Sequence, residues 1–287
     1  MKAVVYSFIF VVLLSSCSDS SVTSDNQGNI KSKTKQLNIK GSDTELPLTQ
    51  NEIEGFLKLN PNASISLTGG GSSVGITALI EGNTDIAMAS RNLTSDENSK
   101  LGNKMQHIVK ATIAYDALAI IVNPSNPINR MTKEQLQNIY LGKVENWKEM
   151  GGIDHKLSAL GREQSSGSYA FFKDHILDGK SYINTMPQMS SNGQIVESIE
   201  QSPNAIGYVG IGYVTSKVKA LAISFDGGKT FINPTMDKVK NGAYKIARPL
   251  YYIYSTDTKA KVEPFLNFVL SDSGQKIVES TGFIKTN

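Results

Sequence analysis

Four short stretches of the sequence combine glycine with small hydroxyl-bearing residues. They are residues 41–44 (GSDT), 70–75 (GGSSVG), 84–91 (TDIAMASR) and 161–168 (GREQSSGS). The first, second and fourth link a strand-like segment to a helix-like one, whereas in the stretch 84–91 Asp85 stands at the start of a strand. The start of a helix offers unpaired backbone N–H groups and a partial positive charge, and glycine lets the backbone approach a ligand closely. Several such helix starts at strand ends predict a cradle for an oxyanion.

Each stretch also has an ordinary interpretation when it is taken alone. Residues 42–44 could only cap a helix, and the glycines at 69–71 could form a flexible turn. Asp85 could cap a strand end, and Arg162 could be a surface arginine in a weak ion pair. The occurrence of all four in one chain favours an anion site, in which the planar guanidinium of Arg162 suits a tetrahedral oxyanion.

Strand-like and helix-like segments alternate along most of the chain. We expect strands near residues 37–40, 64–67, 85–89, 113–122, 157–160, 205–209 and 248–254. We expect helices near residues 46–58, 74–81, 133–140, 168–175, 195–200 and 264–279. This rhythm predicts an α/β fold with largely parallel sheets. The long apolar segments at 113–122 and 248–254 suggest two crossings between lobes, with residues 36–115 and 249–287 in the first lobe and 116–248 in the second.

The N-terminal residues carry the pattern of a bacterial lipoprotein. A short apolar run follows Lys2 and ends in Leu14-Ser15-Ser16-Cys17, which is typical of a lipobox. We therefore expect a signal peptide over residues 1–16, acylation of Cys17, and a flexible polar linker over 17–35. The alternative is an ordinary secretion signal with an incidental cysteine.

Composition excludes several classes of protein. The chain has 287 residues, 39% hydrophobic and 19% charged, with a net charge of +3 and no long basic run, so a nucleic-acid partner is not expected. Its three histidines stand far apart, and we expect neither a metal site nor a cofactor. The glycine-rich turn lacks the Walker lysine, and no Gly-x-Ser-x-Gly elbow is present, so an enzyme is not expected either.

Taken together, these motifs resemble the phosphate-binding proteins of bacterial phosphate-specific ABC transporters, a branch of the type II periplasmic binding proteins. The resemblance spans residues 36–287. It is carried by the Ser72-Ser73 turn, the Asp85 segment, the run 162–168 and the segment 205–209 (AIGYV). It implies a two-lobed fold of mixed, mainly parallel sheets with a hinge.

The resemblance also implies a function. The expected ligand is inorganic phosphate, the expected partner is the permease of an ABC importer, and the expected location is the cell envelope through a lipid anchor. Position by position, the family's phosphate contacts fall on Asp43, Thr44, Ser72, Asp85, Arg162, Ser166, Gly167 and Ser168. The family often has serine or threonine at position 43, so we expect the backbone of Asp43, rather than its carboxylate, to contact the anion.

Asp85 is expected to decide which anion is selected. A carboxylate can accept a hydrogen bond from protonated phosphate but meets only acceptors on sulfate. Two alternatives to a phosphate carrier stay open: a binding protein for another oxyanion such as sulfate or molybdate, and a surface adhesin or sensor that keeps the fold.

Overall fold

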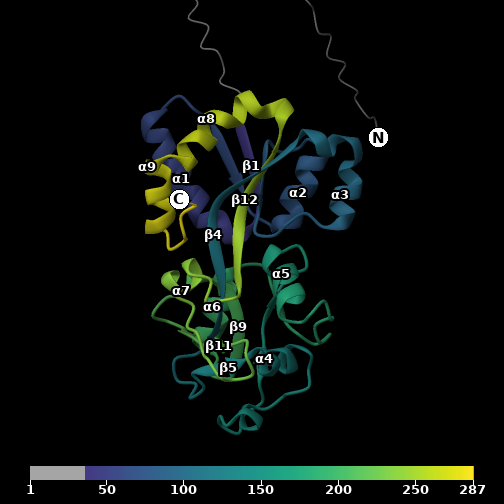
Figure 1. Cartoon of the computed structure of the whole chain (residues 1–287), viewed down its shortest axis with the longest axis vertical. Coiled ribbons are helices and arrows are strands. Elements are labelled where there is room, and N and C mark those ends of the chain that lie inside the picture. Colours follow the sequence, from purple (N-terminus) through teal and green to yellow (C-terminus); the bar gives the residue numbers. More distant parts are fainter. Residues whose placement is uncertain (1–35, 287) are drawn as a thin grey trace, which may run out of the picture. The chain divides into compact units, whose positions relative to one another are not determined.

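A mixed β-sheet with two long central strands organises the chain. The computed structural model describes residues 36–286, so the expected signal peptide, lipidation site and linker lie outside the described residues. The long strands are β4 (Ile108–Val122) and β12 (Ala247–Ser255), which pair antiparallel. They sit in the middle of the strand order β2-β1-β3-β12-β4-β9-β6. Figure 1 shows both running from one half of the structure into the other.

One half of the structure is built from the beginning and the end of the described chain. Its strands β1 (Leu37–Gly41), β2 (Ile65–Thr68) and β3 (Ile86–Ala89) are parallel. Its helical segments are η1 (Asp43–Glu45), α1 (Leu46–Leu59), α2 (Ser72–Ile80), α3 (Ser95–Leu101), η2 (Gly102–His107), η5 (Thr256–Thr258), α8 (Lys259–Leu270) and α9 (Asp272–Ser280). In Figure 1, α1, α8 and α9 lie on one side of these strands and α2 and α3 on the other.

The other half comes from the middle of the chain. Its strands are β5 (Arg130–Thr132), β6 (Ser158–Ala159), β7 (Gly161–Arg162), β8 (Gln188–Met189), β9 (Ala205–Gly210), β10 (Lys219–Ala220) and β11 (Ala222–Ser224). Its helical segments are α4 (Lys133–Tyr140), η3 (Trp147–Met150), α5 (Gly167–His175), α6 (Asn192–Gln201), η4 (Ile211–Tyr213) and α7 (Met236–Lys240). Strand β9 pairs antiparallel with β4 and parallel with β6, which attaches this half to the central sheet.

Each half has a large hydrophobic core of its own. The core of the first half includes Ile39, Leu48, Tyr252, Phe265 and Phe283. The core of the second half includes Ile120, Trp147, Phe172, Tyr208 and Tyr244. We call the elements around these cores the first lobe and the second lobe. Strand β4 contributes Ile113 to the first core and Ile120 to the second, so a single strand is buried in both.

Polar residues set several helix boundaries that apolar spacing did not locate. Helices α2 and α6 begin at Ser72 and Asn192, earlier than expected, because their first turns are polar. The single helix expected over residues 264–279 is wrong: it is two helices, α8 and α9, separated at Ser271. Ser271 has an extended backbone and its Oγ accepts a hydrogen bond from the Gly274 N–H at 3.3 Å, which ends one helix and caps the next.

Candidate functional site

Small hydroxyl-bearing residues from both lobes meet where the lobes touch. Thr44 follows β1 and Ser72 begins α2 in the first lobe, while Ser166 caps α5 in the second. The hydroxyl oxygens of Thr44 and Ser168 lie 3.2 Å apart. In the first lobe, Ser72 Oγ accepts a hydrogen bond of 3.1 Å from the Ser90 N–H. All five side chains are buried, so the cluster is closed to solvent.

Glycine makes this close approach of the lobes possible. A Cβ atom on Gly167, the first residue of α5, would lie 2.3 Å from Ser72 Oγ and 2.4 Å from Ser90 Oγ. Gly71 has a φ of +102°, and a Cβ there would lie 2.5 Å from the Ser165 carbonyl oxygen. Both positions therefore exclude a side chain while the lobes are in contact.

Arg162 brings a buried positive charge to the cluster from the second lobe. Its side chain is 1% exposed, and burial lowers the pKa of its guanidinium, although Asp43 opposes this. Nε donates to the Met189 carbonyl oxygen at 3.2 Å and Nη2 to that of Ser190 at 2.8 Å. Nη1 is buried and finds no acceptor anywhere in residues 36–286. A buried guanidinium with free donors is suited to an anion.

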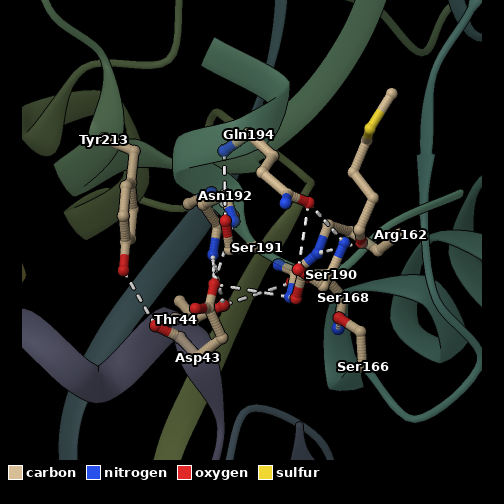
Figure 2. Close-up of polar contacts among 12 residues, drawn as sticks. Asp43, Thr44, Arg162, Ser166, Ser168, Ser190, Ser191, Asn192, Gln194 and Tyr213 are labelled. Carbon is tan, nitrogen blue, oxygen red and sulfur yellow. Dashed lines mark hydrogen bonds and ion pairs between the residues drawn. The ribbon is translucent and has the colours of Figure 1, made fainter. Parts of the chain in front are cut away.

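The Asp43 carboxylate crosses from the first lobe to the second. Its Oδ2 accepts hydrogen bonds from the Asn192 backbone N–H at 2.9 Å and side-chain Nδ2 at 2.7 Å, at the start of α6 (Figure 2). Arg162 Nη2 lies 3.4 Å from the same oxygen. The Tyr213 hydroxyl donates to the Asp43 carbonyl oxygen at 2.8 Å. The carboxylate of Asp43 thus links the lobes, and the second lobe holds it at a helix N-terminus.

A second buried arginine, Arg248, adjoins the same hydroxyl groups. It lies on β12 directly opposite Asp116 on β4. Its Nε and Nη2 donate to Asp116 Oδ2 at 3.0 and 2.8 Å. Nη2 also reaches Ser168 Oγ at 2.9 Å and Thr44 Oγ1 at 3.3 Å. Arg248 therefore contacts both lobes and the strand that joins them.

Two buried carboxyl groups lie in the first lobe close behind the cluster. Burial raises the pKa of Glu45 well above its usual value, and Arg248 opposes the rise. Burial raises the pKa of Glu52 to about 8, although the Tyr252 hydroxyl donates to its Oε2 at 2.5 Å. Burial therefore favours the neutral form of both carboxyl groups.

The structure places Asp85 away from the cluster, unlike the prediction from the sequence. Its carboxylate accepts the Asn38 N–H at 2.7 Å and pairs with Lys261 at 2.7 Å. Asp85 precedes β3 whereas Ser90 follows it, and Ser90 lies beside Ser72. Five residues of extended chain span about 16 Å, so Asp85 lies at the far end of the strand from the cluster. Strand β3 is parallel to β1, so its carboxyl end, where Ser90 stands, lies at the same edge of the sheet as Thr44.

The structure brings the other predicted residues together. Those at the lobe contact are Asp43, Thr44, Ser72, Arg162, Ser166, Gly167 and Ser168. Residues of the site that the sequence did not single out are Ser90, Asp116, Asn192, Tyr213 and Arg248. Ser90 ends the motif at 84–91 and could have been recognised as the hydroxyl at the carboxyl end of a buried strand.

Metal-binding clusters and membrane-spanning helices would point to other functions. Among residues 36–286, no cluster of three or more His, Cys, Asp or Glu side chains could hold a metal ion. In the same range, none of the helices has both the length and the apolar character required to span a membrane.

A two-lobed α/β fold that closes over buried polar residues from both lobes defines a binding protein of the periplasmic type. The family described as "PBP superfamily domain" matches residues 27–273. The phosphate-binding protein PstS of Borreliella burgdorferi is 33% identical over 259 residues, covering 87% of this chain and 90% of that relative. PstS of Staphylococcus saprophyticus is 34% identical, covering 90% and 83%. The chain belongs to the PstS family of phosphate-binding proteins.

Solved structures agree with this assignment. A putative phosphate ABC transporter substrate-binding protein from Clostridium perfringens, solved with bound phosphate, has a TM-score of 0.81 and 32% identity, covering 88% of this chain and all of that one. An ABC-type phosphate transport receptor from Vibrio cholerae has a TM-score of 0.71 and 30% identity, covering 86% and 99%. The shared fold is that of the type II periplasmic binding proteins, as the sequence motifs predicted.

Proposed function

We propose that the protein binds inorganic phosphate outside the cytoplasm and delivers it to the permease of an ABC importer, without catalysing a reaction. The observation that carries this proposal is the closed cluster of hydroxyl groups at the lobe contact, together with the buried Nη1 of Arg162, which has no acceptor within the described chain. The names of the PstS relatives and the phosphate in the Clostridium perfringens structure support the choice of ligand.

The proposed ligand set joins both lobes. The first lobe would offer the backbone of Asp43 and the hydroxyl groups of Thr44 and Ser72, together with Ser90 in place of Asp85. The second lobe would offer the guanidinium of Arg162 and the first turn of α5. The ligands from that turn and its cap are Ser166, Gly167 and Ser168. A helix start and a guanidinium are both suited to a phosphate oxygen.

Binding requires the lobes to separate, because the proposed ligands are buried. We propose that the chain passes from one lobe to the other between residues 115 and 116 on β4 and between residues 248 and 249 on β12. These positions form the hinge. The direct hydrogen bonds between the lobes, such as those that Asn192 donates to Asp43 and that the Ser73 N–H donates to the Ser165 carbonyl oxygen at 3.0 Å, describe the closed state. A ligand that contacts both lobes would stabilise this state.

Arg162→Ala tests the site. The change removes charge-assisted hydrogen bonds of about 1.5–3 kcal/mol, so phosphate affinity should fall by roughly ten- to 150-fold in isothermal titration. The matched control is Arg130→Ala, which removes an exposed arginine of the same lobe that stacks on Phe231. Wild-type affinity in Arg162→Ala would remove Arg162 from the ligand set.

We further propose that Cys17 is acylated and anchors the protein to a bacterial membrane, after removal of residues 1–16 as a signal peptide. The lipobox-like segment ending at Cys17 supports this. Cys17→Ala should move the protein out of the detergent phase, or leave it unprocessed, while phosphate binding persists. An unchanged detergent partition of the variant would contradict the anchor.

A further inference from the structure

Arg248 occupies a position that links both lobes and the proposed hinge. It lies on β12 opposite Asp116 on β4, the strand pair that runs through both halves in Figure 1. Its Nη2 contacts Thr44 from the first lobe and Ser168 from the second, and both are proposed phosphate ligands. The residue is 1% exposed, so its charge is fully desolvated.

The guanidinium of Arg248 has more donors than its neighbours accept. Nε and Nη2 are engaged by Asp116, Thr44 and Ser168. Nη1 is buried and, across residues 36–286, no group accepts a hydrogen bond from it. Leaving a buried charged donor unpaired costs about 1–3 kcal/mol or more. The same is true of Nη1 of Arg162.

Arg162 and Arg248 are also close enough to interact electrostatically. The charge of Arg248 contributes to the lowering of the pKa of Arg162. Two buried cations in one region repel each other unless an anion lies between them. The carboxylates of Asp43 and Asp116 each engage a different arginine and leave both Nη1 atoms free.

We propose that Arg248 is a second anion-binding arginine, whose Nη1 donates to the same phosphate that Arg162 holds. This proposal rests on the proposed function. Under this proposal Asp116 fixes the orientation of the guanidinium. It neutralises the edge that carries Nε and Nη2, and Nη1 stays available. Because Arg248 lies on the hinge strands, the anion would be bound by the first lobe, the second lobe and the hinge together.

The competing explanation is that Arg248 only holds Thr44 and Ser168 in place and balances Asp116. Arg248→Ala cannot separate the two, because it would leave Asp116 buried without its partner. The informative pair is Asp116→Asn and the double variant Asp116→Asn/Arg248→Gln, in which no unpaired carboxylate remains. Arg248 donates to Oδ2 of Asp116 and the Ile211 N–H donates to Oδ1 at 3.1 Å, so the single amide oxygen of asparagine can accept from only one of these two groups.

The experiment is isothermal titration of the full chain with inorganic phosphate at low ionic strength. We expect Asp116→Asn to bind phosphate about two- to tenfold more tightly than the wild type, because one negative charge is removed beside the guanidinium. We expect the double variant to bind at least about tenfold more weakly than Asp116→Asn, since the loss of a charge-assisted bond is worth roughly that factor. Equal affinity of the single and double variants would overturn the proposal.

Two further measurements make the outcome decisive. If the double variant does not fold, Arg248→Lys decides, because lysine keeps the positive charge beside Asp116 but has no second amino group to donate to the anion: wild-type affinity in a folded Arg248→Lys overturns the proposal. The wild type and Arg162→Ala are titrated in parallel. If the wild type does not bind phosphate, the proposed function is refuted. If the wild type binds phosphate, Arg162→Ala loses affinity and the double variant does not, only the role of Arg248 is refuted.

Discussion

Replacing Gly167 by alanine tests whether the two lobes close as tightly as the structure shows. A Cβ atom at this position would lie 2.3 Å from Ser72 Oγ and 2.4 Å from Ser90 Oγ, on the opposite lobe. Neither hydroxyl can withdraw freely, because Ser72 Oγ accepts the Ser90 N–H at 3.1 Å and lies 3.4 Å from Ser90 Oγ. The clash exists only in the closed state, so the change should act on closure and not on either lobe alone.

The expected size follows from the cost of overpacking. Inserting a methyl group into a well-packed contact costs about 1–3 kcal/mol, which corresponds to roughly five- to 150-fold weaker phosphate binding. The open form should be unaffected or slightly more stable, because alanine is a better helix former than glycine at the first position of α5. The melting temperature without phosphate should therefore not fall, while the stabilisation by a fixed phosphate concentration should shrink.

The assay combines isothermal titration with small-angle scattering with and without phosphate. The control is Gly193→Ala in the first turn of α6, where a Cβ atom would meet only Ser191 Oγ at 3.7 Å, an ordinary contact. Wild-type affinity and a normal phosphate-induced change in scattering for Gly167→Ala would refute the closed arrangement of Ser72, Ser90 and α5.

Two other changes test the electrostatics. Burial raises the pKa of Glu52 from 4.5 to about 8, so the folded protein binds an extra proton between these values and loses stability as pH rises through about 8. From pH 6 to pH 9 the wild type should lose about 2–3 kcal/mol more unfolding free energy than Glu52→Gln in urea denaturation, and parallel pH profiles would contradict the buried, protonated carboxyl. Asp85→Asn breaks the pair with Lys261 and should cost about 1 kcal/mol of stability, yet leave the preference for phosphate over sulfate unchanged in competition binding. Loss of that preference would indicate that Asp85 contacts the anion after all.

Much of the local structure could be predicted from the sequence, because its signals are local. Helix α4 begins and ends at the expected residues, Lys133 and Tyr140, where apolar spacing and a Thr132–Gln135 capping box coincide. Strand β4 was placed correctly but starts at Ile108, before its fully buried part. The prediction of one helix over residues 264–279 is wrong because it passes over the polar run 271–276 (SDSGQK), in which Ser271 caps α9.

Within the site, the sequence alone determined the hydroxyl groups and the glycines, because each occurs in a short motif between a strand and a helix. It did not correctly place the contact from the segment 84–91: the family resemblance assigned Asp85, which enters β3, whereas Ser90 at the carboxyl end of the strand faces the second lobe. Nor could it join Arg248 to Asp116, which are 132 residues apart and become neighbours only because β4 and β12 pair in one register. Buried charges are placed by long-range strand pairing, and for that reason only the tertiary structure revealed them.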